Sequence, residues 1–272
     1  MENPLQKIAG EFSQRYPVMQ DLDRRRRRGL KAASILRDML RGRNASIVLD
    51  VGCSNAVFLD VVVKELNAQL GLGVDLDRAA LPKPTSRRVG LVGSALALPL
   101  PDSSVDLILC NHTYEHVPNV FTLFEEIRRV LKPGGIVYFG AMNSRWPIEP
   151  HYHLPFIHWL PTRWSMPIMQ LLGYEMGYLE QPLSPPKLRR LVHNFELHDY
   201  TLKVIKDPKQ YCADDIVYAK LTWAFYPLAK FFYGFLPGYL WVLVKRSKYN
   251  IQSPDLGLPV AVVPIVTPIK CS

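Results

Sequence analysis

The sequence predicts an α/β fold in which helices cover both faces of a mostly parallel β-sheet. Short apolar segments that stop at glycine or at an acidic residue alternate with amphipathic segments through about residue 144. This alternation is typical of a doubly wound sheet. The 272 residues are 48% hydrophobic and 21% charged, so the chain can bury a core of ordinary size. Because 15 of the 23 prolines fall within residues 145–272, the regular alternation is expected to end there.

Five strands and two helices are expected in the alternating region. The strands are short apolar runs bounded by polar residues or glycine, and the helices carry apolar residues at helical spacing. The strands are expected within residues 46–52, 71–77, 89–100, 104–111 and 136–143, and the helices within residues 56–69 and 119–131. The sequence Lys132-Pro133-Gly134-Gly135 is expected to form a turn before the fifth strand.

Elements of other kinds are expected on either side of this region. An amphipathic helix is predicted at about residues 29–42, after the basic run Arg24–Arg28. Its apolar face is formed by Leu30, Ala33, Leu36 and Leu40. Further along the chain, helices are expected at residues 163–174, 186–194 and 214–236, and strands at residues 196–205 and 238–246. The tail of residues 247–272 is apolar but interrupted by prolines, so we expect it to be extended.

Positive charge flanks a slightly acidic centre. The net charge is +9, with 11 basic and 5 acidic residues in residues 1–47, 8 and 10 in residues 48–144, and 14 and 9 in residues 145–272. Such basic flanks favour an anionic partner, either the phosphate backbone of a nucleic acid or an acidic membrane surface.

The cysteines and the N-terminal residues bear on the cellular location. The four cysteines lie far apart and form no Cys-x-x-Cys pair, which argues against a disulfide scaffold or a thiolate zinc site and favours a reducing compartment. The first residues lack the apolar segment of a secretory signal. A cytoplasmic location is therefore expected.

A glycine turn after the first strand predicts a ligand site. The segment Val48–Ala56 reads as a buried strand that ends at Gly52 and opens a helix, a geometry that brings a ligand to a helix N-terminus. Asp75 ends the next strand, where a carboxylate can accept hydrogen bonds from both hydroxyls of a ribose. Because Gly52 is the only glycine in the turn, the dinucleotide fingerprint is missing, which argues against NAD or FAD.

Four segments in register carry a resemblance to a known family. The sequences VLDVGCSNAVFLD, GVDLD, VGSALALPLPDSSVDLILCNHTYEHVPN and RRVLKPGGIVYF resemble the class I S-adenosylmethionine-dependent methyltransferases. More narrowly, they are similar to the small-molecule "type 11" branch that includes quinone-biosynthesis enzymes. The resemblance is strong over about residues 45–144. It implies S-adenosylmethionine as cofactor and a seven-stranded sheet whose last strand is antiparallel.

The resemblance also implies a set of cofactor-binding residues within a methyltransferase domain that we expect at residues 45–246. The residues themselves indicate a basic helical segment at 1–44 before this domain, and within it a lid on the acceptor side at 145–185 and an apolar helical insertion at 213–236. The insertion departs from the family pattern, in which the last two strands usually form a tight antiparallel pair. The cofactor-binding residues that the resemblance implies are Asp50, Gly52, Cys53, Asp75, Leu76, Ser94, Ala95 and Asn111.

Three residues depart from the family pattern. Ser54 and Ala56 stand where the family has glycines, and both disfavour the positive φ that glycine allows. Ser94 replaces the usual aspartate, and losing that charge-assisted hydrogen bond would weaken cofactor binding by about 1.5–3 kcal/mol. These departures leave open a second hypothesis, in which the chain is a non-catalytic relative that acts as a binding or assembly protein.

Transfer to an oxygen acceptor requires a base, and histidine is the side chain best suited near neutral pH. His112 and His116 follow the fourth strand, and His151 and His153 follow the fifth. We expect the base to be His116 or His153. Together with Glu115, His112 and His116 also form a possible divalent-cation set, but the main interpretation includes no metal.

The aromatic residues near the C-terminus suggest the acceptor. Residues 220–245 are rich in Trp, Phe and Tyr with lysines at the edges, a composition typical of a helix at a membrane interface. We therefore expect methyl transfer to a hydroxyl, or to a carbon or amine, of a hydrophobic or lipid-linked small molecule by a peripheral membrane enzyme. An RNA substrate is the remaining alternative because of the basic N-terminal segment. The Asn/Asp-Pro-Pro-aromatic motif of amino-methylating enzymes is absent at residues 111–114.

Overall fold

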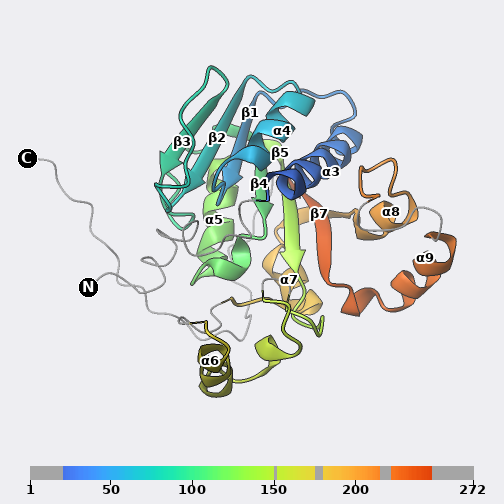
Figure 1. Cartoon of the computed structure of the whole chain (residues 1–272). Helices are drawn as coiled ribbons and strands as arrows, with labels where there is room; N and C mark the ends of the chain where they lie inside the picture. The colour runs from blue at the N-terminus through green and yellow to red at the C-terminus, as the bar shows by residue number, and fades with distance from the viewer. Residues whose placement is uncertain (1–20, 150–151, 175–179, 215–221, 247–272) are drawn as a thin grey trace, which may run out of the picture.

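The protein folds around one seven-stranded sheet with the strand order β3-β2-β1-β4-β5-β7-β6 (Figure 1). The computed structural model describes residues 21–149, 152–174, 180–214 and 222–246. The strands are β1 (Ile47–Val51), β2 (Leu70–Asp75), β3 (Arg88–Val92), β4 (Val105–Asn111), β5 (Leu131–Met142), β6 (Phe195–Asp199) and β7 (Gly238–Lys245). β7 runs antiparallel to both of its neighbours, β5 and β6. The predicted doubly wound sheet with an antiparallel last strand is therefore confirmed.

Helices pack on both faces of this sheet (Figure 1). On one face α3 (Leu22–Leu40), α4 (Val57–Glu65) and α8 (Thr201–Lys206) contribute to one apolar cluster. On the other face α5 (Val120–Val130) and α7 (Pro185–Leu191) contribute to a second cluster. Along β1, Val48 belongs to the first cluster, whereas Leu49 and Val51 belong to the second. The central strands are thus buried on both faces, as a parallel sheet requires.

α3 begins earlier than the sequence predicts and includes the arginine run. The Asp21 side chain accepts a hydrogen bond from the backbone N–H of Arg24, which caps the helix at Leu22. Leu30, which was expected on the apolar face, is exposed, whereas Gly29 is buried against α4. Small residues mark this interface because the two helix backbones approach closely.

Two predicted elements are wrong in part. The strand expected at residues 196–205 ends at Asp199, because the Asp199 side chain accepts from the N–H of Thr201 and α8 starts there. The expected turn at Lys132-Pro133-Gly134-Gly135 lies inside β5 as an irregularity. Pairing with β4 passes from Leu131 directly to Ile136, and Gly134 takes a φ of +72°.

Two long segments meet the sheet at the end of β5 and the start of β7. The first leaves β5 and contains η3 (Ile157–Trp159) and α6 (Thr162–Leu171) before α7 and β6. The second follows α8 and enters β7 through α9 (Thr222–Phe231) and η5 (Tyr233–Phe235). α6, α7 and α9 agree with the expected helices, although residues 215–221 of the third lie outside the described residues. The tail of residues 247–272 lies outside them too. Within the part of the chain that the structure describes, no helix is both long enough and apolar enough to cross a membrane.

Candidate functional site

The carboxyl ends of β1, β2 and β4 form the edge where the expected site residues meet. Asp50 on β1 is paired with Gly73 of β2 on one side and with Leu109 of β4 on the other. Asp75 is the last residue of β2 and Asn111 is the last residue of β4. Because ligands bind at the carboxyl ends of parallel strands, the register alone places these three polar residues at one candidate site.

The loop after β1 turns sharply through three left-handed residues. Gly52, Ser54 and Ala56 have φ values of +76°, 48° and 55°. A Cβ on Gly52 would lie 2.8 Å from Cγ2 of Thr113, so this position requires glycine. The hydroxyl of Thr113 donates to the Val51 carbonyl at 2.8 Å and ties the loop after β4 to β1. Ser54 and Ala56 were expected to disfavour positive φ, yet they adopt the glycine-like conformation.

Asp75 joins β2 to this loop. Its Oδ2 accepts from the backbone N–H of Ser54 at 2.7 Å, and its Oδ1 accepts from the backbone N–H of Asp77 at 2.9 Å. Burial raises the pKa of the Asp75 carboxyl, and these two hydrogen bonds work against that rise. Leu76, which follows directly, is half-buried. The expected ribose-binding carboxylate therefore has a fixed orientation.

Asp50 is a buried carboxyl whose charge depends on pH. Burial raises its pKa to about 7, the positive charge of Arg25 works against the rise, and the charge of Asp75 adds to it. A carboxyl in this state is half-ionised near neutral pH. Cys53, which is also buried here, has a thiol pKa raised by burial.

Arg25 of α3 is a site residue that the sequence analysis missed. Its Nη1 donates to Oδ1 of Asn55 at 3.1 Å and its Nη2 donates to Oγ of Ser54 at 3.4 Å. The first turn of α3 thus contacts the loop after β1. The missed signal was the spacing of Arg25 and Arg28 relative to buried Ala32, which puts all three on one helical face.

The loop after β3 lies beside the end of β2. The N–H of Gly93 donates to the carbonyl of Asp75 at 3.0 Å. The Ser94 hydroxyl accepts from the N–H of Leu96 at 3.1 Å, so it is held by its own loop. Ala95 packs against the core. Ser94 and Ala95 directly follow Gly93, whose N–H contacts Asp75. This position beside the proposed ribose-binding carboxylate is the one expected of residues that contact the adenine.

The segment after β4 contains a histidine beside a buried carboxylate. His112 has a φ of 56°, and its N–H donates to the carbonyl of Gly140 at 2.9 Å. Its Nδ1 lies 3.4 Å from Oε1 of Glu115, whose side chain is fully buried. Burial alone would raise the pKa of Glu115, but the contact with His112 and the charges of His112 and His116 hold it below its ordinary value.

The expected base residues lie in two places. His116 is half-buried in η2 (Tyr114–His116), directly after the β4 edge. His153 is exposed in the connection between β5 and α6, and His151 lies outside the described residues. Across the described ranges, no three His, Cys, Asp or Glu side chains are arranged to hold a metal ion.

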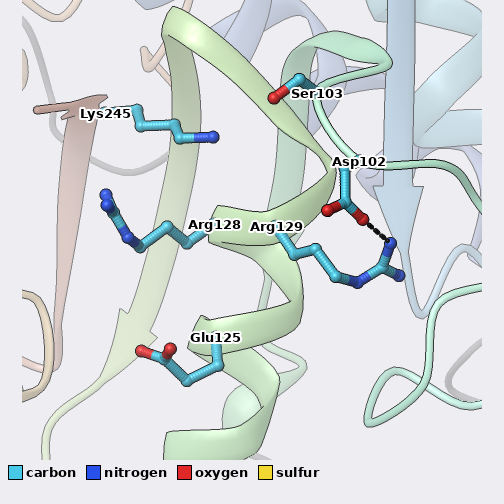
Figure 2. A pocket seen from close by; sticks show the side chains of 6 residues that line it. All are labelled: Asp102, Ser103, Glu125, Arg128, Arg129 and Lys245. Carbon is cyan, nitrogen blue, oxygen red and sulfur yellow. Dashed lines mark hydrogen bonds and ion pairs between the residues drawn. The ribbon is translucent and has the colours of Figure 1, made fainter. Parts of the chain in front are cut away.

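A polar recess of about 250 Å³ lies at the opposite end of the sheet. Figure 2 shows the side chains that line it, which include Arg128, Arg129 and Lys245. Arg129 binds Asp102 at 2.8 Å, and Lys245 donates to the Leu131 carbonyl. The first contact joins α5 to the loop before β4, and the second joins β7 to the start of β5, so we interpret the recess as structural.

Comparison with known proteins identifies methyltransferases as relatives of this chain. Residues 49–139 match the model of a family described as "Methyltransferase domain". A demethylmenaquinone methyltransferase of Roseiflexus castenholzii is 34% identical over 170 residues, which cover 58% of this chain and 70% of that protein. A malonyl-[acyl-carrier protein] O-methyltransferase of Marinomonas sp. is 31% identical over 39% of this chain and 42% of its own length. The match thus covers more than two thirds of the Roseiflexus protein but less than half of the Marinomonas protein.

Solved structures show the same fold. The plantazolicin methyltransferase BpumL, solved with S-adenosylhomocysteine, has a TM-score of 0.56 at 13% identity, covering 89% of this chain and 94% of its own. A Burkholderia thailandensis 1,6-didemethyltoxoflavin-N1-methyltransferase has a TM-score of 0.54 at 15% identity, covering 91% and 92%. The chain belongs to the class I S-adenosylmethionine-dependent methyltransferases and uses S-adenosylmethionine as its methyl donor.

Proposed function

We propose that this enzyme transfers the methyl group to a hydroxyl of a hydrophobic or lipid-linked small molecule at a membrane surface. The observation that carries this proposal is a set of exposed apolar side chains on two segments of the chain, one that contains α6 and one that contains α9. Both segments meet the sheet where β5 ends and β7 begins. The name of the Roseiflexus relative, which acts on demethylmenaquinone, supports an apolar acceptor.

The proposed cofactor site consists of the residues around the β1 and β2 ends. The residues fit a ligand with a cationic sulfonium and a ribose, because Asp50 and Asp75 supply two carboxylates at adjacent strand ends. Gly52 leaves room for close backbone approach, and Arg25 supplies a cation next to the loop. S-adenosylmethionine supplies a methyl group that its sulfonium makes strongly electrophilic, so the protein has mainly to orient and desolvate the acceptor.

We propose His112 as the base that removes the acceptor proton, in preference to His116 and His153. His112 lies directly after β4, and the buried Glu115 carboxylate beside its Nδ1 stabilises the protonated ring. Its left-handed backbone is a conformation that non-glycine residues adopt more often at functional sites than elsewhere. His116 and His153 remain the alternatives.

The residues proposed to contact the membrane lie on α6, on α9 and on their flanking turns, two segments that Figure 1 draws well apart, α6 at the lower left and α9 at the right. Large apolar side chains are exposed on both: Phe156, Trp159, Trp164, Leu171, Leu172, Phe225, Leu228, Phe231, Phe232 and Phe235. Both segments connect to the sheet at one point, because Met142 at the end of β5 pairs with Gly238 at the start of β7. The amide of Asn143 donates to the carbonyls of Gly234 and Leu236, which fixes the second segment to this edge.

The proposal is tested by labelling. The full chain is incubated with S-adenosylmethionine carrying a labelled methyl group and with a bacterial lipid extract, and the label is followed into organic and aqueous phases. We expect the label in the organic phase, in a product that carries it as an O-methyl ether. Cleavage of that ether by strong acid should release the labelled methyl group. Label confined to the aqueous phase, or to RNA added in parallel, would contradict the proposal.

A further inference from the structure

The arginine run at the start of α3 has two faces. Arg24, Arg26 and Arg27 are exposed, whereas Arg25 and Arg28 are half-buried. Arg25 reaches the loop after β1. Arg28 lies one turn further along the same face. The next residue, Gly29, packs against Phe58, whose ring centroid lies 6.1 Å from that of Tyr138 on β5.

Close helix packing fixes the position of Arg28. At the next residue, Gly29, a Cβ would lie 2.8 Å from Cβ of Val61 on α4 and 3.3 Å from the carbonyl oxygen of Phe58. The α3 backbone therefore lies directly against α4 at this point. A helix held this closely cannot shift to move Arg28 into water without losing the contact.

Groups that favour and groups that disfavour its positive charge lie near Arg28. Burial and the charges of Arg24 and Arg25 lower its pKa, while Tyr138 on β5 and Glu115 after β4 work against the decrease. The Glu115 carboxylate is itself beside His112. Burial likewise raises the pKa of Tyr138, so its ring stays neutral.

Arg28 differs from Arg25 in its partners. Arg25 donates to Asn55 and Ser54. Among the described residues, by contrast, none forms a hydrogen bond or an ion pair with Arg28. Partial burial of a guanidinium without an anionic partner is unfavourable, and a bound anion would offset that cost.

We propose that Arg28 is the anion subsite for the methyl acceptor, which therefore carries a carboxylate or phosphate group as well as its apolar part. The inference rests on the proposed function, since it identifies the class of acceptor. A guanidinium matches a carboxylate or phosphate with two parallel hydrogen bonds. The Tyr138 hydroxyl and the Glu115 carboxylate both lie near enough to Arg28 to act on it electrostatically. They come from β5 and from the segment after β4, next to the proposed base.

The test compares two amphiphiles that share one tail. Farnesyl phosphate and farnesol are titrated, below their aggregation concentrations, into the full chain saturated with S-adenosylhomocysteine. The variants are R28Q and the matched control R26Q, which removes an exposed arginine two residues away. We expect the parent and R26Q to prefer the phosphate by about tenfold or more, as a charge-assisted hydrogen bond predicts. R28Q is expected to bind both ligands equally.

Several outcomes would overturn the inference. Equal affinity of the parent for the two amphiphiles, or no binding of either, excludes the subsite, and so does a preference that R28Q retains. A second arm uses phosphatidylglycerol vesicles: if R28Q weakens vesicle binding alone, Arg28 contacts lipid headgroups instead. Affinity for S-adenosylhomocysteine separates failure of the Arg28 subsite from failure of the proposed function. If the parent binds S-adenosylhomocysteine but shows no preference for farnesyl phosphate over farnesol, only the Arg28 subsite is excluded.

Discussion

Oδ2 of Asp75 accepts a hydrogen bond from the backbone N–H of Ser54 at 2.7 Å. This contact joins the end of β2 to the loop after β1, so the residue proposed to bind the ribose also shapes the loop proposed to hold the rest of the cofactor. The same loop contacts Arg25 of α3 through Asn55. The proposed cofactor site is therefore assembled from three elements, and a change in one carboxylate is expected to affect all of them.

Replacing Asp75 with asparagine should weaken cofactor binding by at least about tenfold, because a carboxylate that accepts from hydroxyls is replaced by a weaker, neutral acceptor. Asparagine keeps one oxygen, which can still accept from the N–H of Ser54, although its NH2 cannot accept from the N–H of Asp77. The loop after β1 should therefore persist. Calorimetric titration with S-adenosylhomocysteine measures the effect. Asp60→Asn, which alters the ion pair between Asp60 on α4 and Arg88 on β3, is the control and should bind as the parent does. Equal affinities for all three proteins would exclude Asp75 from the site.

Replacing Ser54 with glycine should stabilise the protein by about 0.5–1 kcal/mol. The φ of 48° is unfavourable for serine, and glycine removes that strain, which outweighs its greater freedom in the unfolded chain. Ser34→Gly, in the interior of α3, is the control and should destabilise by about 1 kcal/mol. Urea unfolding at pH 7 compares the variants. A loss of stability in Ser54→Gly would show that its contact with Arg25 matters more than the strain.

The alternation of strands and helices and the polar residues at the strand ends were predictable from local pattern, whereas the seven strands and the antiparallel last strand were expected only from the family resemblance. Apolar runs that end in glycine or aspartate identify β1 and β2, and parallel strands bring Asp50 and Asp75 to one edge whatever the helices do. The face of α3 was not predictable in the same way. Its interface with α4 uses Gly29 rather than the large Leu30, so hydrophobic spacing selected the wrong residue.

The contacts of the arginines and histidines depend on three-dimensional arrangement. From sequence alone, a run of five arginines indicates a solvated helix. Once α3 is packed on the sheet, Arg25 and Arg28 become half-buried and Arg25 contacts the loop after β1. In the same way, the backbone turn at His112 brings its ring to Glu115. The sequence places both histidines after β4 but does not show which one lies beside the carboxylate.

The pKa of Asp50 predicts how stability depends on pH. It is raised from 3.8 to about 7 by burial, so the folded protein holds a proton that the unfolded chain releases above pH 4. The free energy of unfolding should therefore fall as pH rises from about 4 to about 7, by on the order of 4 kcal/mol, and level off above. Asp75, whose pKa is also raised, adds a change of the same sign.

Asp50→Asn isolates this effect because it removes one titrating group and keeps the size of the side chain. Urea unfolding of the parent and the variant at pH 5, 6, 7 and 8 provides the comparison. The variant should gain stability relative to the parent as pH rises. A constant difference between the two proteins would mean that Asp50 is ionised throughout this range.

Phe231 tests the proposed membrane surface, since 82% of it is exposed on α9. Phe231→Ser should weaken binding to phosphatidylglycerol vesicles by about tenfold, because transfer of a large apolar side chain from water is worth about 1.5–3 kcal/mol. Phe231→Leu keeps an apolar side chain and should retain most of the binding. Vesicle sedimentation at fixed salt measures both. If the serine and leucine variants bind alike, α9 does not enter the membrane interface.

The proposed base predicts a particular pH profile. A histidine that accepts the acceptor proton must be neutral, so the rate should rise with pH until the ring is deprotonated. His112→Gln should lower kcat by about 100-fold or more while leaving S-adenosylhomocysteine affinity unchanged. Glu115→Gln removes the carboxylate that favours the protonated ring. The rising limb of its profile should therefore move to lower pH, with a smaller loss of rate.

The measurement is the initial rate of label transfer into lipid extract between pH 5.5 and 9. His193→Gln, at an exposed residue just after α7, is the control. A merely structural role for Glu115 would lower the rate at every pH without moving the limb. If His116→Gln abolishes transfer and His112→Gln does not, the base is the histidine of η2, and the contact between His112 and Glu115 serves only to hold the turn after β4.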